Sequence, residues 1–474
     1  MSGNQQRIPD RKEINLGEGK VGKLLFRLAL PAITAQIINL LYNLVDRVYI
    51  GHLPGIGASA LTGVGVTLPV ILAISAFASL FSTGGAARAS IMMGRKKKEE
   101  AERIMGNCAA ALLAAALALT VFFQIFGRNI LMMFGASDNT IGYAWDYMQL
   151  YSLGTVFVQI ALGLNYFINA QGYATMGMLS VIIGAGTNII LDPILMFGFD
   201  MGVQGAALAT IISQGLSALW IVIFLCSPRS FLKLRIRNFK ILPGVLGPCI
   251  ALGASPFVMQ FTESILNVCF NISLKAYGGD IAVGVMAVLS SVMQFALLPI
   301  TGMTQGSQPI VSYNYGAGKM DRVKQAFQCL LKASVTYAVI LWALAILFPQ
   351  MFMRMFTTDA EYIAMGTWAM RVYTAGICVM GVQYACQQTF VALGNARTSL
   401  LLALLRKVFL LIPLIFILPH IITNHKVFAV FLAEPTADVA AAATTATLFF
   451  RYLKKLMNTG RKTKEAAYDS QRQG

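Results

Sequence analysis

Twelve long apolar segments alternate with short polar ones along this sequence, and each apolar segment is long enough to cross a lipid bilayer as a helix. Because no water reaches the bilayer core, a spanning segment must satisfy its backbone hydrogen bonds internally, as an α-helix does. Only 12% of the residues are charged and 57% are hydrophobic, a composition too apolar for a water-soluble domain of this length. We therefore predict an all-α membrane protein, surrounded by a lipid bilayer, with spans at residues 23–51, 59–83, 104–126, 141–170, 175–198, 203–226, 248–276, 281–304, 326–348, 362–393, 398–419 and 427–451.

The basic residues indicate how these helices are oriented. They give a formal net charge of +17, but they lie in short tracts and not along one amphipathic face, so we expect no nucleic-acid partner. Cytoplasmic loops of membrane proteins contain an excess of Lys and Arg. The basic tracts all fall on that side when the N-terminus is cytoplasmic, at residues 95–98, 229–240, 319–324 and 454–464. The sequence thus predicts both termini in the cytoplasm.

The two halves of the chain resemble each other at a nearly constant offset. Ser90, Gly94, Lys97, Phe134, Tyr151, Gly154 and Gly172 reappear as Ser312, Gly316, Lys319, Phe356, Tyr373, Gly376 and Gly394. Such a repeat indicates duplication of a six-helix unit, and two units related by an axis along the membrane normal face each other across a central cleft. We predict a cytoplasmic N-terminal segment (1–22), an N lobe of helices 1–6 (23–226), a basic cytoplasmic linker (227–247), a C lobe of helices 7–12 (248–453) and a cytoplasmic tail (454–474).

The cysteines and histidines give no sign of a metal or redox centre. The seven cysteines are odd in number, fall mostly inside apolar segments and have no CxxC spacing. The three histidines lie near helix ends and form no ligand cluster. We therefore expect no structural metal and no cofactor.

Polar residues recur on one face of the first predicted helix. They are Gln36, Asn39, Asn43 and Asp46, at spacings of three, four and three. In the fifth helix, Asn188 and Asp192 are one turn apart, and Pro193, which cannot donate a backbone hydrogen bond, follows directly. A carboxylate at the membrane centre costs about 2.5–3.5 kcal/mol, so Asp46 and Asp192 predict a functional site.

The seventh predicted helix repeats this pattern with Gln260, Glu263, Asn267 and Asn271 on one face. For the amides, an alternative stays open, in which they only join helices by hydrogen bonds worth about 0.6–2 kcal/mol each. Aligning the two halves on their prolines places Asn271 opposite Asp46 and Ile412 opposite Asp192. Because the paired carboxylates occur only in the N-terminal half, we expect ion coupling there.

Two further acids, Glu434 and Asp438, are one turn apart near the start of the last predicted span. At that position they either meet water or take part in the coupling, and both alternatives stay open.

The motifs that include the N-terminal acids resemble the multidrug and toxic compound extrusion family, and within it the DinF-like and MepA-like bacterial branch. They are LYNLVDRVYIG at 41–51, NIILDPILMFG at 188–198 and GAALAT at 205–210. The similarity extends from about residue 22 to 453. It implies a monomer in a bacterial inner membrane, with two six-helix lobes around a cleft, that exports varied organic cations using a proton or sodium gradient.

The resemblance also implies roles for individual residues. The coupling residues are Asp46, Asn188, Asp192, Thr210 and Tyr147, and the helix-bending proline is Pro31. Some relatives place a cation site in the C lobe with a seventh-helix glutamate, which Glu263 resembles, and a tenth-helix aspartate, where this chain has Gln383, Gln387 and Gln388. We expect no complete site there, and we expect Gln383 and Gln387 to line the substrate cleft together with Gln36, Asn39, Asn43, Gln260, Glu263, Asn267 and Asn271.

We hypothesise that Asp46 and Asp192, in an outward-facing state, take up protons, or Na+ held together with Asn188. Neutralised in this way, they release a lipophilic organic cation, so that drug and ion compete. Repacking near Pro31 and Pro193 would then close the lobe. Both coupling ions stay open, because carboxylates bind sodium as well as protons.

Three other functions compete with this reading. A lipid-linked precursor flippase of the same superfamily would need cationic cleft residues to meet a pyrophosphate, whereas the only obvious helix-borne arginines are Arg27, Arg371 and Arg406. An integral-membrane transferase would need a His/Asp or clustered acidic site at the membrane interface, which we do not find. A channel agrees less well with duplicated lobes that contain mid-membrane acids. We therefore predict a transporter and not an enzyme.

Overall fold

The structure is a computed structural model that describes residues 15–357 and 359–472 of the chain. Within these residues it consists of helices and connecting loops and contains no strand. Most of the predicted N-terminal segment 1–22, and the last two residues of the predicted tail 454–474, lie outside the described residues.

Seven α-helices of the N lobe form six spans. They are α1 (Val21–Gly51), α2 (Gly57–Gly94), α3 (Lys98–Met133), α4 (Ile141–Leu153), α5 (Thr155–Ala170), α6 (Ala174–Pro193) with the π-helical turn η1 (Ile194–Gly198), and α7 (Gly202–Cys226). Helices α4 and α5 meet at Gly154 at an angle of 59°, so the two form one bent span. A side chain at Gly154 would clash with Ile211 of α7, so glycine lets the bend pack closely.

The remaining helices form the C lobe. After η2 (Ile236–Asn238) come α8 (Pro243–Gly316), α9 (Met320–Leu347), α10 (Pro349–Arg354), α11 (Ala360–Tyr373), η3 (Thr374–Gly376), α12 (Ile377–Ala392), α13 (Ala396–Leu404), the π-helical η4 (Leu405–Leu411), α14 (Ile412–Ile421), η5 (Thr423–His425) and α15 (Lys426–Arg472). The segment from α11 to α12 forms one span, and the segment from α13 to α14 forms another.

Helix α8 contains two spans. Its 74 residues would reach about 110 Å as one straight helix, whereas the bilayer core is about 30 Å thick. The backbone leaves helical geometry at Gly279, where φ is +66°, a conformation that glycine adopts readily. Nine other apolar helices and the bent α4–α5 pair supply the other ten spans. The prediction of twelve transmembrane helices is thus confirmed.

Equivalent contacts recur in the two lobes. Ser90 Oγ donates a hydrogen bond to the carbonyl of Ala170 at 3.0 Å, and Ser312 Oγ donates to the carbonyl of Ala392 at 2.8 Å. Both pairs are separated by the same number of residues, and the second is displaced from the first by the offset seen in the sequence. The two bundles are therefore copies of one packing arrangement, as the repeat predicts.

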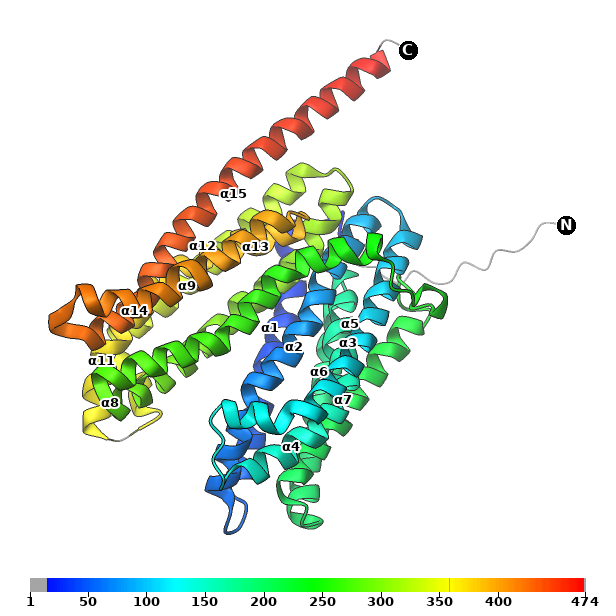
Figure 1. The fold of residues 1–474 in the computed structure, drawn as a ribbon. Helices are drawn as coiled ribbons and strands as arrows, with labels where there is room; N and C mark the ends of the chain where they lie inside the picture. The colour runs from blue at the N-terminus through cyan, green and yellow to red at the C-terminus, as the bar shows by residue number, and fades with distance from the viewer. Residues whose placement is uncertain (1–14, 358, 473–474) are drawn as a thin grey trace.

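In each lobe, the first turns of one helix pack in the core of the other lobe. Leu25 and Leu28, in the first turns of α1, pack in a C-lobe core beside Phe327. In the same way Leu246 and Cys249, at the start of α8, belong to an N-lobe core. The lobes are therefore held together at the end of the molecule that includes the linker, and they diverge toward the opposite end (Figure 1).

Two equivalent glycines lie where α2 and α8 approach each other closely. A Cβ atom at Gly94 of α2 would clash with the carbonyl of Tyr313, and one at Gly316 of α8 would clash with the carbonyl of Ile91. The two contacts are equivalent under the repeat, so α2 and α8 cross near the pseudo-symmetry axis. Both partners are backbone atoms, which cannot rotate away as a side chain can.

We expect Gly94→Ala to destabilise the protein by about 1–3 kcal/mol, because the added methyl forces two packed backbones apart. Thermal unfolding of the detergent-purified protein, followed by size-exclusion chromatography, measures this loss. Gly65→Ala is the matched control, since a Cβ atom at Gly65 of the same helix meets nothing within 4 Å. Equal melting temperatures for the two variants would contradict the close crossing.

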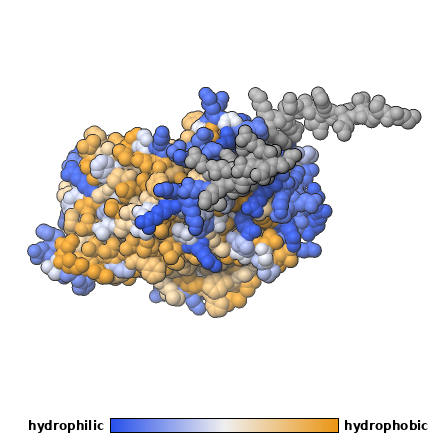
Figure 2. All heavy atoms as spheres, turned by 90° about the horizontal axis from the view of Figure 1, so that it is seen from above, coloured by the Kyte–Doolittle hydropathy of each residue, from blue (hydrophilic) through white to orange (hydrophobic). Residues whose placement is uncertain are grey.

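The surface is suited to a lipid environment. Large apolar side chains such as Phe26, Leu117, Ile125 and Ile340 are more than half exposed. Seen from the end that includes the linker, hydrophobic residues cover much of the flanks, whereas hydrophilic residues gather in separate groups (Figure 2). Such contiguous apolar flanks identify a multi-pass membrane protein.

Candidate functional site

The five predicted coupling residues meet inside the N lobe. Helix α1 supplies Asp46, α6 supplies Asn188 and Asp192, α7 supplies Thr210 and α4 supplies Tyr147, and all five are buried. Asn188 Nδ2 donates hydrogen bonds to Asp192 Oδ1 at 3.1 Å and to Thr210 Oγ1 at 3.5 Å. Thr210 also interacts with the hydroxyl of Tyr147. Four helices thus contribute to one polar cluster.

Several acceptor oxygens in this cluster face no donor. Asp46 Oδ1, Asp192 Oδ2 and Asn188 Oδ1 are buried and have no hydrogen-bond partner among the described residues. The two carboxylates are also near enough to repel each other. Oxygen atoms of this kind can hold a Na+ ion, and a proton on either carboxylate would relieve the repulsion equally. The arrangement therefore fits a small cation between α1 and α6.

Two polar residues of the cluster were missed by the sequence analysis. Tyr42 interacts with Gln214 of α7 and lies close to both Asp46 and Asp192. The available signal was spacing, because Tyr42 precedes Asp46 by one helical turn and shares its face. Gln214 follows Thr210 by one turn in α7 and offered the same signal.

The two predicted helix-bending prolines, Pro31 and Pro193, differ in how the backbone continues around them. Pro193 ends the α-helical part of α6, and the chain continues as the π-helical turn η1, so the backbone pattern changes directly beside Asp192. Pro31 lies inside α1, which continues as one helix from Val21 to Gly51. Helix bending at either proline during transport stays a prediction.

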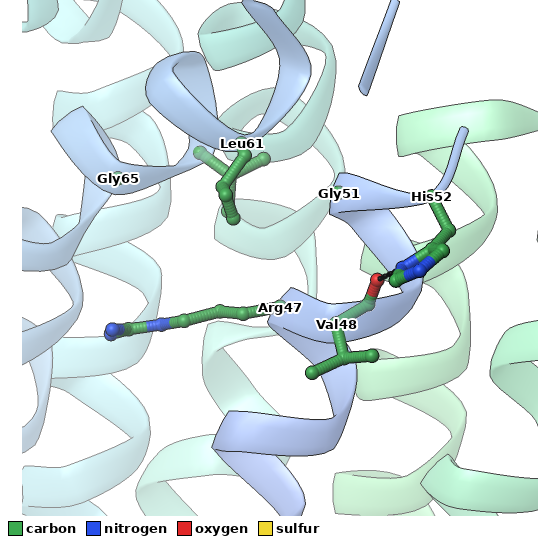
Figure 3. A pocket seen from close by; sticks show the side chains of 7 residues that line it. Arg47, Val48, Gly51, His52, Leu61 and Gly65 are labelled. Carbon is green, nitrogen blue, oxygen red and sulfur yellow. Dashed lines mark hydrogen bonds between the residues drawn. The ribbon is translucent and has the colours of Figure 1, made fainter. Parts of the chain in front are cut away.

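A separate cavity of about 440 Å³ opens at the far end of α1 and α2 (Figure 3). It is lined by Arg47, Val48, Gly51, His52, Leu61, Val64 and Gly65. The ring Nδ1 of His52 lies 2.7 Å from the carbonyl of Val48, and Arg47 extends in the opposite direction. Arg47 and Arg88 are among several helix-borne arginines that the sequence analysis did not name, so the count of three was wrong.

The predicted cleft residues Gln36 and Gln260 join the lobes. Gln36 Nε2 donates a hydrogen bond to Gln305 Oε1 at 3.2 Å, and Gln260 Nε2 donates one to Ser79 Oγ at 3.0 Å. The first bond connects α1 with the second half of α8, and the second connects the first half of α8 with α2. These glutamines close the base of the cleft on the linker side.

The other polar residues of the two predicted stripes lie beyond this base. Asn39 is half-buried, whereas Asn43 on α1 and Glu263, Asn267 and Asn271 on α8 are exposed. Asn43 donates to the carbonyl of Asn39 at 2.6 Å, and Asn267 donates to the carbonyl of Glu263 at 3.0 Å. In both bonds the amide nitrogen is the donor, and the amide oxygen takes no part.

The remaining two predicted cleft residues lie in the interior of the C lobe. Gln383 and Gln387 of α12 are 0% and 3% exposed. Gln383 Nε2 donates to Gln387 Oε1 at 3.1 Å, and Gln387 Nε2 donates to Ser255 Oγ at 3.2 Å. Their amides therefore join α12 to α8 and do not belong to the exposed stripe, because a buried amide needs an internal partner.

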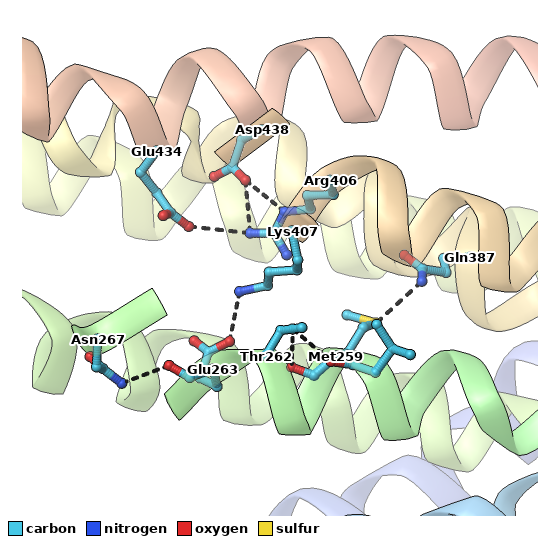
Figure 4. Close-up of polar contacts among 10 residues, drawn as sticks. Met259, Thr262, Glu263, Asn267, Gln387, Arg406, Lys407, Glu434 and Asp438 are labelled. Carbon is cyan, nitrogen blue, oxygen red and sulfur yellow. Dashed lines mark hydrogen bonds and ion pairs between the residues drawn. The ribbon is translucent and has the colours of Figure 1, made fainter. Parts of the chain in front are cut away.

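A network of five charged side chains crosses the C lobe (Figure 4). Its members are Glu263 of α8, Arg406 and Lys407 of η4, and Glu434 and Asp438 of α15. Arg406 Nη2 lies 2.7 Å from Asp438 Oδ1 and 3.4 Å from Glu434 Oε1. Lys407 Nζ lies 2.7 Å from Glu263 Oε2. Three helices of the lobe are thus tied by ion pairs.

The burial of this network decides between the two alternatives left open for Glu434 and Asp438. Glu434 and Asp438 are buried, so the alternative in which they meet water is wrong. The physical reason is that α15 begins at Lys426, which places both acids well inside the helix. Lys407 was overlooked, although an Arg–Lys doublet within an otherwise apolar span indicates acidic partners elsewhere in the fold.

Comparisons with known proteins agree with this arrangement. The chain is 24% identical over 411 residues to the multidrug export protein MepA of Staphylococcus haemolyticus, covering 87% of this chain and 90% of that protein. It is 25% identical over 422 residues to MepA of Staphylococcus aureus, with coverage of 89% and 92%. The outward-facing structure of a multidrug resistance MATE family transporter of the MOP superfamily superimposes with a TM-score of 0.87 at 22% identity, over 94% of this chain and 99% of the other. A MOP superfamily transporter from Pyrococcus furiosus gives the same four values.

The family model named MatE matches this chain twice, at residues 31–194 and 256–417. Each match falls within one lobe, which agrees with the internal repeat. The resemblance drawn from the motifs and the prediction of a transporter rather than an enzyme are both confirmed. With most of its length matched and two six-helix lobes in the arrangement of the solved MATE structures, this chain belongs to the MatE family of membrane transporters.

Proposed function

We propose that this protein is a secondary active efflux antiporter that exports lipophilic, mostly cationic compounds in exchange for H+ or Na+. The main support is the buried pair Asp46 and Asp192, each with a carboxylate oxygen that has no hydrogen-bond partner among the described residues. Unmatched acceptors suit an ion that is taken up and released in each cycle. The name multidrug export protein borne by the relatives from Staphylococcus supports the same class of substrate.

In the proposed cycle, the two carboxylates attract an organic cation while they are charged. Uptake of a proton or Na+ from outside neutralises them, so the cation loses its electrostatic attraction and leaves. The lobes then rock about their contact at the base of the cleft, near Gln36 and Gln260, and expose the site to the other side. An inward ion gradient drives the cycle, because the ion binds outside and leaves inside.

The charge of the interior disfavours the lipid-precursor flippase. A pyrophosphate would need unpaired cations in the cleft. Arg406 and Lys407 are instead engaged by Asp438 and Glu263 at 2.7 Å each, and Arg47 lines the separate cavity at the far end of α1. The exposed stripes themselves consist of amides and one carboxylate. An acidic and neutral lining is better matched to cationic guests.

We also propose a location and orientation. A bacterial inner (plasma) membrane is the expected location because the relatives from Staphylococcus are named as export proteins of bacteria. Lys96 to Lys98, the linker, and Lys319 with Arg322 lie at the end of the bundle where α1 begins, so the positive-inside rule puts that end in the cytoplasm. In this orientation the lobes diverge toward the outside.

Proteoliposomes test this function directly. We expect purified protein to move a fluorescent lipophilic cation against its gradient when either a proton or a sodium gradient is imposed in the opposite direction. Each gradient is applied alone, and an ionophore that collapses it should stop net movement. Equal transport with and without both gradients would contradict antiport.

A further inference from the structure

The charged network of the C lobe contains one more carboxylate than basic side chains. Arg406 and Lys407 supply two positive charges, while Glu263, Glu434 and Asp438 supply three negative charges when ionised. Apart from Glu263, whose side chain is 53% exposed, every member is almost completely buried. An uncompensated charge inside a membrane protein is strongly unfavourable, so the network needs one further positive charge.

The contacts indicate which carboxylate holds that charge. Asp438 receives two short contacts from Arg406, at 2.7 Å from Nη2 and 2.8 Å from Nε. Glu434 receives one longer contact, at 3.4 Å from the same Nη2. Two tyrosines also face the network: Tyr373 of α11 interacts with the acids, and Tyr384 of α12 interacts with Arg406 and Lys407. Both are neutral as phenols. A proton on Glu434 therefore completes the charge balance with the least loss of ion pairing.

Lys407 has two carboxylates within its electrostatic reach. It contacts Glu263 at 2.7 Å and also interacts with Glu434. In Figure 4 its side chain extends from η4 toward Glu263, and its ammonium group lies between the two acids. A flexible four-carbon side chain allows the ammonium to exchange one partner for the other.

Glu263 is the member of the network that a guest in the cleft can reach. It lies on the exposed stripe of α8 with Asn267 and Asn271, while Lys407 lies behind it, with 6% of its side chain exposed. A cation that arrives from the cleft therefore meets the carboxylate first and competes with the lysine for it.

We propose that the C lobe contains a second exchange site, in which an organic cation that binds Glu263 displaces Lys407 onto Glu434 and thereby expels the proton from Glu434. The charge balances at each stage: one guest cation enters the network, one proton leaves, and Lys407 and Arg406 stay charged throughout. In the outward-facing state the exchange runs in reverse, and proton uptake by Glu434 returns Lys407 to Glu263 and releases the guest. This inference rests on the proposed function, because it needs a cationic guest in the cleft.

Proton release on ligand binding tests the exchange. Tetraphenylphosphonium is a suitable probe because it has no proton of its own. In weakly buffered detergent solution, a pH-indicator dye reports protons and equilibrium dialysis reports the bound probe. The background is the D46N/D192N variant, in which the N-lobe carboxylates cannot contribute. We expect this background to release about one proton per bound cation. Added Glu434→Gln should abolish the release and weaken binding, so release is compared at equal amounts of bound probe.

Two further variants sharpen the result. Glu361→Gln, at an exposed carboxylate near the start of α11, is the matched control and should leave the release unchanged. If Glu434→Gln does not give a monodisperse protein, Lys407→Met replaces it, because without the ammonium the probe can still bind Glu263 but nothing moves onto Glu434, so release should be lost while binding persists.

The possible results distinguish a failure of this exchange from a failure of the proposed function. Cation transport by the wild type, combined with no proton release from the D46N/D192N background, would overturn the exchange alone. Undiminished release after Glu434→Gln would also overturn it. A wild type that neither binds nor transports tetraphenylphosphonium would contradict both.

Discussion

Asparagine in place of Asp192 should reduce gradient-driven export of an organic cation by about tenfold or more, to the level of protein-free vesicles. The amide is nearly the same size and can keep the contact with Asn188, which now lies 3.1 Å from Asp192 Oδ1. It cannot bind a proton reversibly or supply negative charge to a cation. The fold is therefore retained while the exchange step is lost, and the measurement is efflux from proteoliposomes under an imposed proton or sodium gradient.

The chain offers a matched control for this variant. Asp200 follows the same span, is exposed, and has φ of +55°, a conformation that asparagine tolerates well. Asp200→Asn removes an equal charge without touching the buried cluster, so export should stay at the wild-type rate. Full export by Asp192→Asn, with both proteins equally abundant in the vesicles, would refute the assignment of coupling to the N lobe.

The N-lobe cluster could be predicted from the sequence because its signals are local. Helical spacing puts Asn188 directly beside Asp192, and an acid such as Asp46 in an apolar span is costly enough to imply a role. The structure brings both acids together with Thr210 and Tyr147. The meeting of four helices was expected only through the family resemblance, since spacing within one helix says nothing about its neighbours.

The C-lobe network could not be predicted in the same way because its partners are distant in sequence. Lys407 and Glu263 are separated by 144 residues, and Arg406 and Asp438 by 32. Periodicity located each charge on a helix but did not show that the charges face one another. Gln383 and Gln387 illustrate the same limit, since a stripe of amides predicts a polar face without deciding whether that face meets the cleft or another helix.

The contacts that join the two lobes could also not be predicted from each helix taken separately. The spans were predicted as two separate bundles, whereas the first turns of α1 pack with Phe327 of the C lobe and the start of α8 packs in the N lobe. Leu25 and Leu246 are ordinary apolar residues in sequence, and only tertiary packing decides which core they join.

Methionine in place of Arg406 should destabilise the protein by about 3–5 kcal/mol, because it leaves acids buried without their main partner. Asp438 would lose contacts at 2.7 and 2.8 Å, and Glu434 would lose its contact at 3.4 Å. Both acids are almost fully buried, so water cannot replace the guanidinium. Thermal or denaturant-induced unfolding of the purified protein measures the loss.

The same reasoning predicts a rescue. Adding Asp438→Asn to Arg406→Met removes the unpaired charge, so most of the lost stability should return, although an amide without a partner keeps a smaller cost.

Arg27→Met is the control for loss of an arginine from a membrane helix, because Arg27 is exposed on α1 and makes no ion pair among the described residues. Its stability should change by less than about 1 kcal/mol. If Arg406→Met were as stable as Arg27→Met, Asp438 would have to be neutral in the folded protein as well as Glu434, and the charge balance assigned to the C lobe would be wrong.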